Sequence, residues 1–192
     1  MRVAFAINTR DKSIIPGLIS FMTRSPAYHC ELVFSDSKAI SAQRDGVQII
    51  DRQYDWFGWT ALPIPWIDWQ AEKGIRAQAE LIADHCLGRG ASAYDYFGAL
   101  FGRLNARWEI PAKWYCSELV SYLLFPYTPV LNEHKWYSPG MLWETLSNYL
   151  NVIEPKYMNI CAFRYCSPKK SKSSKKIDEV ESPDSEAEIS GS

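Results

Sequence analysis

The aromatic residues of this chain end abruptly before its last stretch. The eight Trp, eleven Tyr and eight Phe residues all precede residue 167, whereas residues 167–192 carry five Lys followed by six acidic residues, with Ser and Pro between them. A segment of that composition buries too little apolar surface to offset the entropy cost of ordering it. We therefore expect one folded domain over residues 1–166 and a disordered charged tail over residues 167–192, whose charge blocks could dock a protein partner.

Periodicity in the first 166 residues predicts a mixture of strands and helices, and therefore the α+β class. Short apolar runs bounded by turn residues predict strands, and apolar residues at helical spacing predict helices. The Trp- and Pro-rich segment 54–69 has no clean period, and its Pro63 and Pro65 favour an extended edge. The predicted strands are 3–7, 29–34, 38–41, 46–50 and 159–165, and the predicted helices are 71–87, 94–104, 116–125 and one from Ser138-Pro139 to about residue 150.

Charge and cysteine content limit the classes of partner. With the tail set aside, basic and acidic residues balance at 16 each, so there is no basic field for a nucleic-acid backbone and we expect no nucleic-acid partner. An odd count of five Cys argues against a closed disulfide framework and favours a reduced intracellular chain.

Since neither a signal peptide nor a bilayer-spanning apolar run stands out, we expect a cytoplasmic chain when made, without a transmembrane anchor.

Of the five cysteines, Cys116 has the sequence position that most favours a reactive thiol. It lies at the start of the predicted helix 116–125, shortly after Pro111. A thiol in the first turn of a helix is near the positive end of the helix dipole and near unpaired backbone N–H groups, and both favour the thiolate. The same N–H groups can stabilise an oxyanion. Packing as a small apolar residue is the competing interpretation.

His29 supplies a candidate base for that thiol. Strand alternation places His29, Glu31 and Val33 on one face of the predicted strand, with Cys30 and Leu32 on the other. An imidazole beside a carboxylate suits a base that accepts the thiol proton and is held in orientation by the acid. An exposed polar face of an edge strand remains the alternative, and we expect Cys30 to serve core packing.

The order of motifs resembles that of a known family. The chain carries HCELVFSD at residues 29–36, DGVQI at 45–49, YDYFG at 94–98 and WYCSELV at 114–120. Over residues 2–125 this series resembles the circularly permuted papain-like cysteine hydrolases related to the NlpC family, with the YiiX/YaeF-like branch and its phage relatives looking closest. The resemblance implies an α+β fold in which a helix with the nucleophilic Cys at its N-terminus packs on an antiparallel sheet that carries the His. It also implies metal-independent cleavage of an amide or ester bond through an acyl-thioester.

Carried over to this chain, the resemblance assigns Cys116 as the nucleophile and His29 as the base. For the third polar residue we favour Glu31, while Ser41 and Gln43 on the following strand stay open. Candidate substrate-binding residues are Tyr94, Tyr115 and Trp56; for Tyr94, as for Tyr96, packing is an equal alternative.

No cofactor is expected, and Cys161 and Cys166 lack the spacing and paired ligands of a zinc site. Candidate substrates are a peptidoglycan-type peptide, another isopeptide or amide, and a lipid acyl ester. The permuted relatives include the lecithin:retinol acyltransferase group, so a lipid acyltransferase is one alternative. A non-catalytic structural or binding protein that retains the fold, such as a virion component, is the other.

Overall fold

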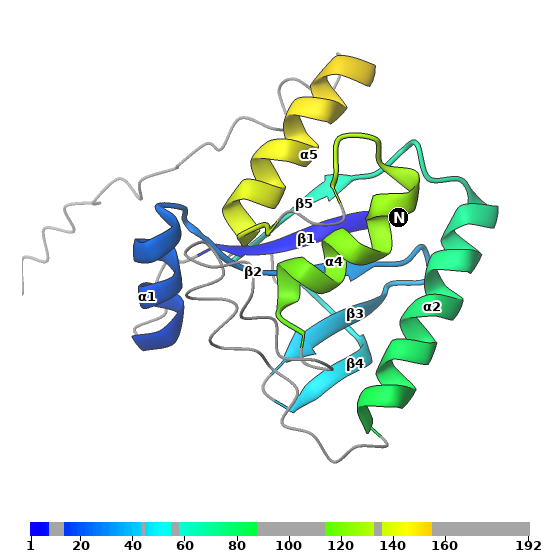
Figure 1. Cartoon of the computed structure of the whole chain (residues 1–192), viewed down its shortest axis with the longest axis horizontal. Helices are drawn as coiled ribbons and strands as arrows, with labels where there is room; N and C mark the ends of the chain where they lie inside the picture. Colours follow the sequence, from blue (N-terminus) through cyan, green and yellow to red (C-terminus); the bar gives the residue numbers. More distant parts are fainter. Residues whose placement is uncertain (8–13, 44, 55–57, 88–113, 133–135, 155–192) are drawn as a thin grey trace, which may run out of the picture. The chain divides into compact units, whose positions relative to one another are not determined.

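A five-stranded antiparallel sheet with the order β4-β3-β2-β1-β5 organises the structure (Figure 1). The computed structural model describes residues 1–7, 14–43, 45–54, 58–87, 114–132 and 136–154, all within the compact unit Met1–Ala162. The predicted α+β class is confirmed. The strands are β1 (Arg2–Ile7), β2 (Ala27–Val33), β3 (Lys38–Gln43), β4 (Gly46–Asp51) and β5 (Trp59–Pro63).

Four of these strands lie where the apolar runs predicted them. The fifth, β5, comes from the segment without a clean period and is the last strand of the described sheet next to β1. Pro63 is its final residue, a position where the missing backbone N–H is tolerated. The predicted helix 94–104, the predicted strand 159–165 and the predicted tail 167–192 lie outside the described residues.

The helices are α1 (Ile14–Thr23), α2 (Trp69–Leu87), α4 (Cys116–Leu124) and α5 (Pro139–Ile153), with a short 3-10 turn, η1 (Phe125–Tyr127), after α4. Local chemistry explains their ends. The Asp68 carboxylate accepts the Ala71 N–H at the start of α2, and the Ser138 hydroxyl accepts the Met141 N–H at the start of α5, as predicted for this cap. The α-helical hydrogen-bond pattern gives way to η1 at Phe125, next to Pro126.

Helix α1 was not predicted. Its sequence, IIPGLISFMT, is apolar almost throughout and contains both Pro16 and Gly17, so it lacks the alternation of polar and apolar faces that reveals a surface helix. Within the described residues, no helix has the length and apolar character needed to cross a bilayer.

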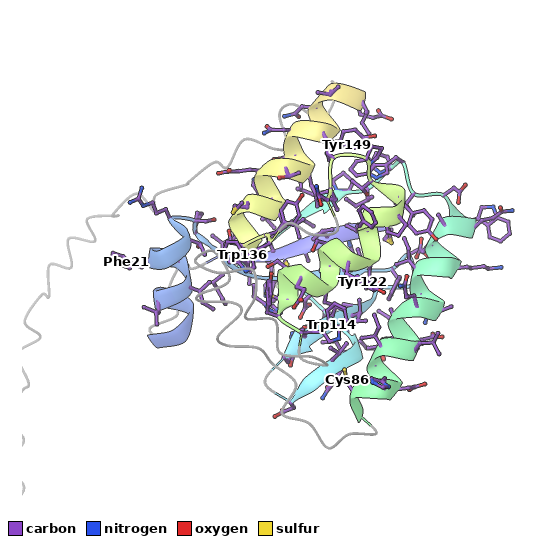
Figure 2. All side chains as sticks on the ribbon, viewed as in Figure 1. Phe21, Cys86, Trp114, Tyr122, Trp136 and Tyr149 are labelled. Atoms are coloured by element: carbon purple, nitrogen blue, oxygen red, sulfur yellow. The ribbon has the colours of Figure 1, made fainter. Side chains whose placement is uncertain are left out.

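The main core lies between the sheet and the helices α2, α4 and α5, which contact it through β4, β2, β3 and β5. Figure 2 shows the side chains that fill this space. Cys30 and Leu32 of β2 belong to the main core. On the other face of the sheet, Ala4, Val33 and Ala39 form a smaller buried cluster, against which Tyr54 and Trp59 pack. The predicted division of β2 into two faces is therefore confirmed.

Candidate active site

The first turn of α4 positions the Cys116 thiol. Tyr115, with an extended backbone at φ −103° and ψ 162°, precedes the helix, which begins at Cys116. The Glu118 carboxylate accepts the Tyr115 N–H over 3.3 Å, and the Ser117 hydroxyl donates to the Tyr137 carbonyl over 2.6 Å. These bonds tie the start of the helix to its surroundings, so that the sulfur is held where the helix dipole is positive.

A bulge in β2 lies directly beside His29. Ala6 of β1 is opposite His29 and Ile7 is opposite Ala27, so Tyr28 is an extra residue in the pairing. Ala27 and Cys30 both enter the main core although they are three residues apart, which regular alternation does not allow. A bulge turns the strand locally. His29 here contacts Cys116 as well as Glu31 on its own face.

The Nε2 atom of His29 is directed at two oxygens. It lies 3.3 Å from Glu31 Oε1 and 3.2 Å from Ser41 Oγ. Of the three candidates for the third polar residue, the structure therefore brings two to the imidazole. The third, Gln43, pairs with Gly46 beside the β3–β4 turn.

Two residues that the sequence did not single out hold the Glu31 carboxylate. Arg52 binds it with both ends of its guanidinium, at 2.8 Å to Oε1 and 3.2 Å to Oε2. The Tyr54 hydroxyl donates to Oε2 over 2.9 Å. Arg52 and Tyr54 follow β4 two positions apart. In an extended segment this spacing places both side chains on one side, and it is the sequence signal that could have identified them. The Trp59 ring contacts the His29 ring edge-on at 6.0 Å between centroids.

These contacts keep a buried carboxylate charged. Burial by itself would raise the pKa of Glu31, but the hydrogen bonds from His29 and Arg52 and the positive charge of His29 lower it to about 2. Glu31 is 0% exposed, so its negative charge acts on the neighbouring imidazole with little screening by water.

Cys116 and His29 form a charged pair. Hydrogen bonding from the Cys30 thiol lowers the pKa of Cys116 and, against the effect of burial, the His29 charge lowers it further, to well below its ordinary 9.0. Burial would lower the pKa of His29, but the Cys116 and Glu31 charges raise it to about 10. Both shifts favour the same charged form of the pair, a thiolate beside an imidazolium.

Cys30 lies closer to the site than expected. It packs in the core as predicted, at 0% exposure, but its thiol and its backbone N–H both hydrogen-bond to Cys116. Burial raises the pKa of the Cys30 thiol well above its ordinary value, and the neighbouring Cys116 charge raises it further. It is therefore the proton donor of the two thiols.

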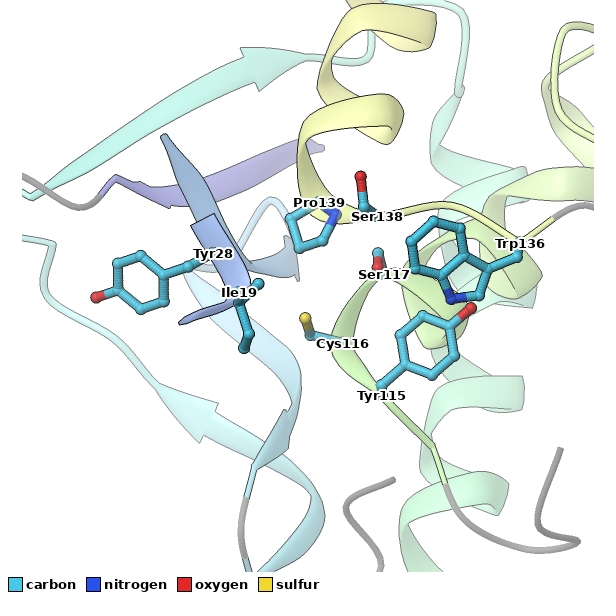
Figure 3. Close-up of a pocket in the computed structure, with 8 residues that line it drawn as sticks. All are labelled: Ile19, Tyr28, Tyr115, Cys116, Ser117, Trp136, Ser138 and Pro139. Atoms are coloured by element: carbon cyan, nitrogen blue, oxygen red, sulfur yellow. The ribbon is translucent and has the colours of Figure 1, made fainter. Parts of the chain in front are cut away.

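A pocket of ≈ 200 Å³, counting the part open to solvent, lies over Cys116. Figure 3 shows the Cys116 sulfur facing the space between Ile19 of α1 and the start of α5. The lining is largely aromatic and apolar, and it comprises Ile19, Tyr28, Tyr115, Cys116, Ser117, Trp136, Ser138 and Pro139. Of the candidate substrate-binding residues, Tyr115 lines this pocket, whereas Tyr94 and Trp56 lie outside the described residues. In the described part of the chain, no His, Cys, Asp and Glu side chains gather in a group of three or more suited to a metal ion.

Comparison of the chain with protein-family models, with curated proteins and with solved structures finds no match. The chemical meaning of the site must therefore come from the contacts of its own residues.

Proposed function

We propose that this protein is a cysteine hydrolase of the permuted papain-like, NlpC-related type, which cleaves an amide or ester bond through an acyl-thioester. The observation that carries the proposal is the contact between Cys116 at the start of α4 and His29, whose Nε2 is directed at Glu31 and Ser41. A nucleophile beside a base, with the base oriented by a third group, is the arrangement that covalent acyl transfer requires.

In the proposed reaction, the Cys116 thiolate attacks the carbonyl carbon of the substrate. The backbone N–H of Cys116 helps to hold the oxyanion of the tetrahedral intermediate. The His29 imidazolium then gives its proton to the departing nitrogen or oxygen, leaving an acyl-thioester on Cys116. Water attacks the thioester while neutral His29 accepts its proton, and the thiolate returns when the acid leaves.

Glu31 and Ser41 act on this cycle through His29. Their oxygens lie at 3.3 and 3.2 Å from Nε2, so they orient the ring. The Glu31 charge also stabilises the imidazolium. Arg52 and Tyr54 in turn fix the carboxylate. These are positioning residues, because they act on the reacting sulfur through His29.

The substrate classes remain a peptidoglycan-type peptide, another isopeptide or amide, and a lipid acyl ester or amide. The apolar lining at Ile19, Trp136 and Pro139 favours an apolar group next to the scissile carbonyl. The same lining supports a second candidate function, transfer of a lipid acyl group from the thioester to an acceptor other than water.

Acylation of the intact protein tests the proposal. The wild-type chain is mixed with p-nitrophenyl acetate and p-nitrophenyl octanoate, and the acyl adduct is located by peptide mass spectrometry while p-nitrophenolate release is followed. We expect a burst of release and an adduct on Cys116, both lost in Cys116→Ala. The matched control is Cys86→Ala, which removes a buried thiol of α2 (Figure 2) and should leave both signals.

Three outcomes separate the alternatives. Equal labelling of the wild type and Cys116→Ala would refute Cys116 as nucleophile. An adduct that forms on Cys116 but is released only when an alcohol or amine acceptor is added would favour the acyltransferase. Absence of any adduct with either ester would favour a non-catalytic module that retains the fold.

A further inference from the structure

In the proposed hydrolysis the Cys30 thiol only hydrogen-bonds to Cys116 and is not itself changed chemically. It is 0% exposed on the helix-covered face of β2, and α4 packs directly on that strand. The packing brings the Cys30 thiol into hydrogen-bond contact with Cys116. Two cysteines that are 86 positions apart in the chain therefore meet beside the pocket that Cys116 lines.

The two thiols differ in access and in charge. Cys116 is 2% exposed and lines the pocket, and its pKa is lowered, which favours the thiolate. Cys30 is fully enclosed, and burial raises the pKa of its thiol. Cys116 is therefore the sulfur that an oxidant reaches first, and Cys30 is the thiol next to it.

We propose that Cys30 and Cys116 are a redox modification site, in which a hydroperoxide oxidises Cys116 and Cys30 then closes a reversible disulfide with it. Cys116 is the reacting sulfur and Cys30 the resolving one. The inference needs a reactive Cys116 but no hydrolytic activity, so it goes beyond the proposed function.

The chemistry balances with hydrogen peroxide as the oxidant. The Cys116 thiolate attacks one peroxide oxygen, an S–O bond forms, the O–O bond breaks, and the leaving hydroxide takes the His29 proton to become water. Sulfur is oxidised to a sulfenic acid, and the peroxide is reduced. Cys30 sulfur then attacks Cys116 sulfur, the S–S bond forms, the S–O bond breaks, and hydroxide leaves with the Cys30 proton as a second water.

The contact between the sulfurs favours this second step over further oxidation. Sulfurs already in hydrogen-bond contact have to approach to about 2 Å to form the bond. A disulfide removes the nucleophile, but it also protects Cys116 from irreversible oxidation to sulfinic and sulfonic acid. Reduction by a dithiol restores the thiolate.

The test uses the full-length chain, first reduced and then treated with a small excess of hydrogen peroxide. After quenching, thiols are blocked with N-ethylmaleimide in denaturant, and the peptides are analysed with and without dithiothreitol. We expect a Cys30–Cys116 cross-linked peptide, loss of N-ethylmaleimide labelling at both positions, and full return of labelling after reduction. The matched control Cys86→Ala should behave as the wild type.

Variants at Cys30 test whether its thiol resolves the oxidised Cys116. In Cys30→Ala and Cys30→Ser, peroxide should leave Cys116 as a sulfenic acid that dimedone traps, and longer exposure should give sulfinic acid that dithiothreitol does not reverse. Circular dichroism identifies whichever variant keeps the fold. The inference is overturned if the folded wild type gives Cys116 sulfinic acid without a cross-linked peptide, or if Cys116 pairs with another cysteine. Because the ester assay is run separately on reduced protein, either proposal can fail while the other holds.

Discussion

His29→Gln should make the Cys116 thiol less reactive by removing the positive charge beside it. In the native site the imidazolium and the hydrogen bonds of Cys30 hold the pKa of Cys116 well below 9.0 despite burial. Without the imidazolium, less remains to offset the effect of burial, which raises the pKa of Cys116. If the thiol returns to its ordinary pKa of 9.0, roughly one molecule in a thousand carries the thiolate at pH 6.

The rate should fall by less than the thiolate population does. Intrinsic nucleophilicity rises with pKa, with a Brønsted coefficient of about 0.4–0.5, so part of the loss is recovered. We therefore expect alkylation of Cys116 by iodoacetamide at pH 6 to slow by roughly 10- to 100-fold in His29→Gln. Near pH 10 the variant thiol is ionised as well, and the difference should disappear or reverse.

The assay is the pH dependence of iodoacetamide labelling at Cys116, resolved from the other cysteines by peptide mass spectrometry. The matched control is His85→Gln, which changes an exposed histidine of α2 and should give the wild-type profile. Equal labelling rates for the wild type and His29→Gln at pH 6 would refute the charged pair and, with it, the reason for assigning His29 as the base.

Three further predictions concern stability, measured by urea denaturation. In Gly140→Ala the new Cβ would overlap Oγ and Cβ of Ser25, so we expect the free energy of unfolding to fall by about 1–3 kcal/mol and Ser25→Gly to restore most of it. An unchanged midpoint would contradict the close fit. Glu31→Gln should lower the free energy of unfolding by about 2–4 kcal/mol, because it leaves the partly buried Arg52 without its carboxylate. A decrease under about 1 kcal/mol would mean that the ion pair contributes little to stability. In the unfolded chain His29 loses its proton around its ordinary pKa of 6.5 and Cys116 around 9.0, whereas the folded chain keeps the His29 proton to about pH 10. Above pH 9.0 the unfolded chain holds a proton on neither side chain, whereas the folded chain holds the His29 proton until about pH 10. Stability should therefore fall as pH rises through that window. A double variant lacking both His29 and Cys116 should lose less stability there.

The local parts of this fold were predictable because local chemistry specifies them. Turn residues bound the apolar runs that became β1 to β4, and Ser138 with Pro139 marked the start of α5. Alternation along β2 correctly placed His29 and Glu31 on one face. Helix α1 escaped prediction because its residues are apolar almost throughout, which leaves no periodic signal to detect.

From the sequence, residue types and places on predicted elements indicated Cys116 as nucleophile, His29 as base and Glu31 as orienting group, and the family resemblance added Ser41 and Gln43 as alternatives for the orienting group. Only the tertiary structure decided which of them meet. His29 and Cys116 are 87 positions apart, and they meet where α4 packs against β2, with a bulge at Tyr28 next to His29. The Arg52 and Tyr54 contacts to Glu31 and the Cys30 contact to Cys116 are likewise long-range. The predicted helix start already favoured a Cys116 thiolate, but the contributions of the His29 charge and of the Cys30 thiol could not be inferred from sequence. Both come from residues that are distant along the chain and close in space.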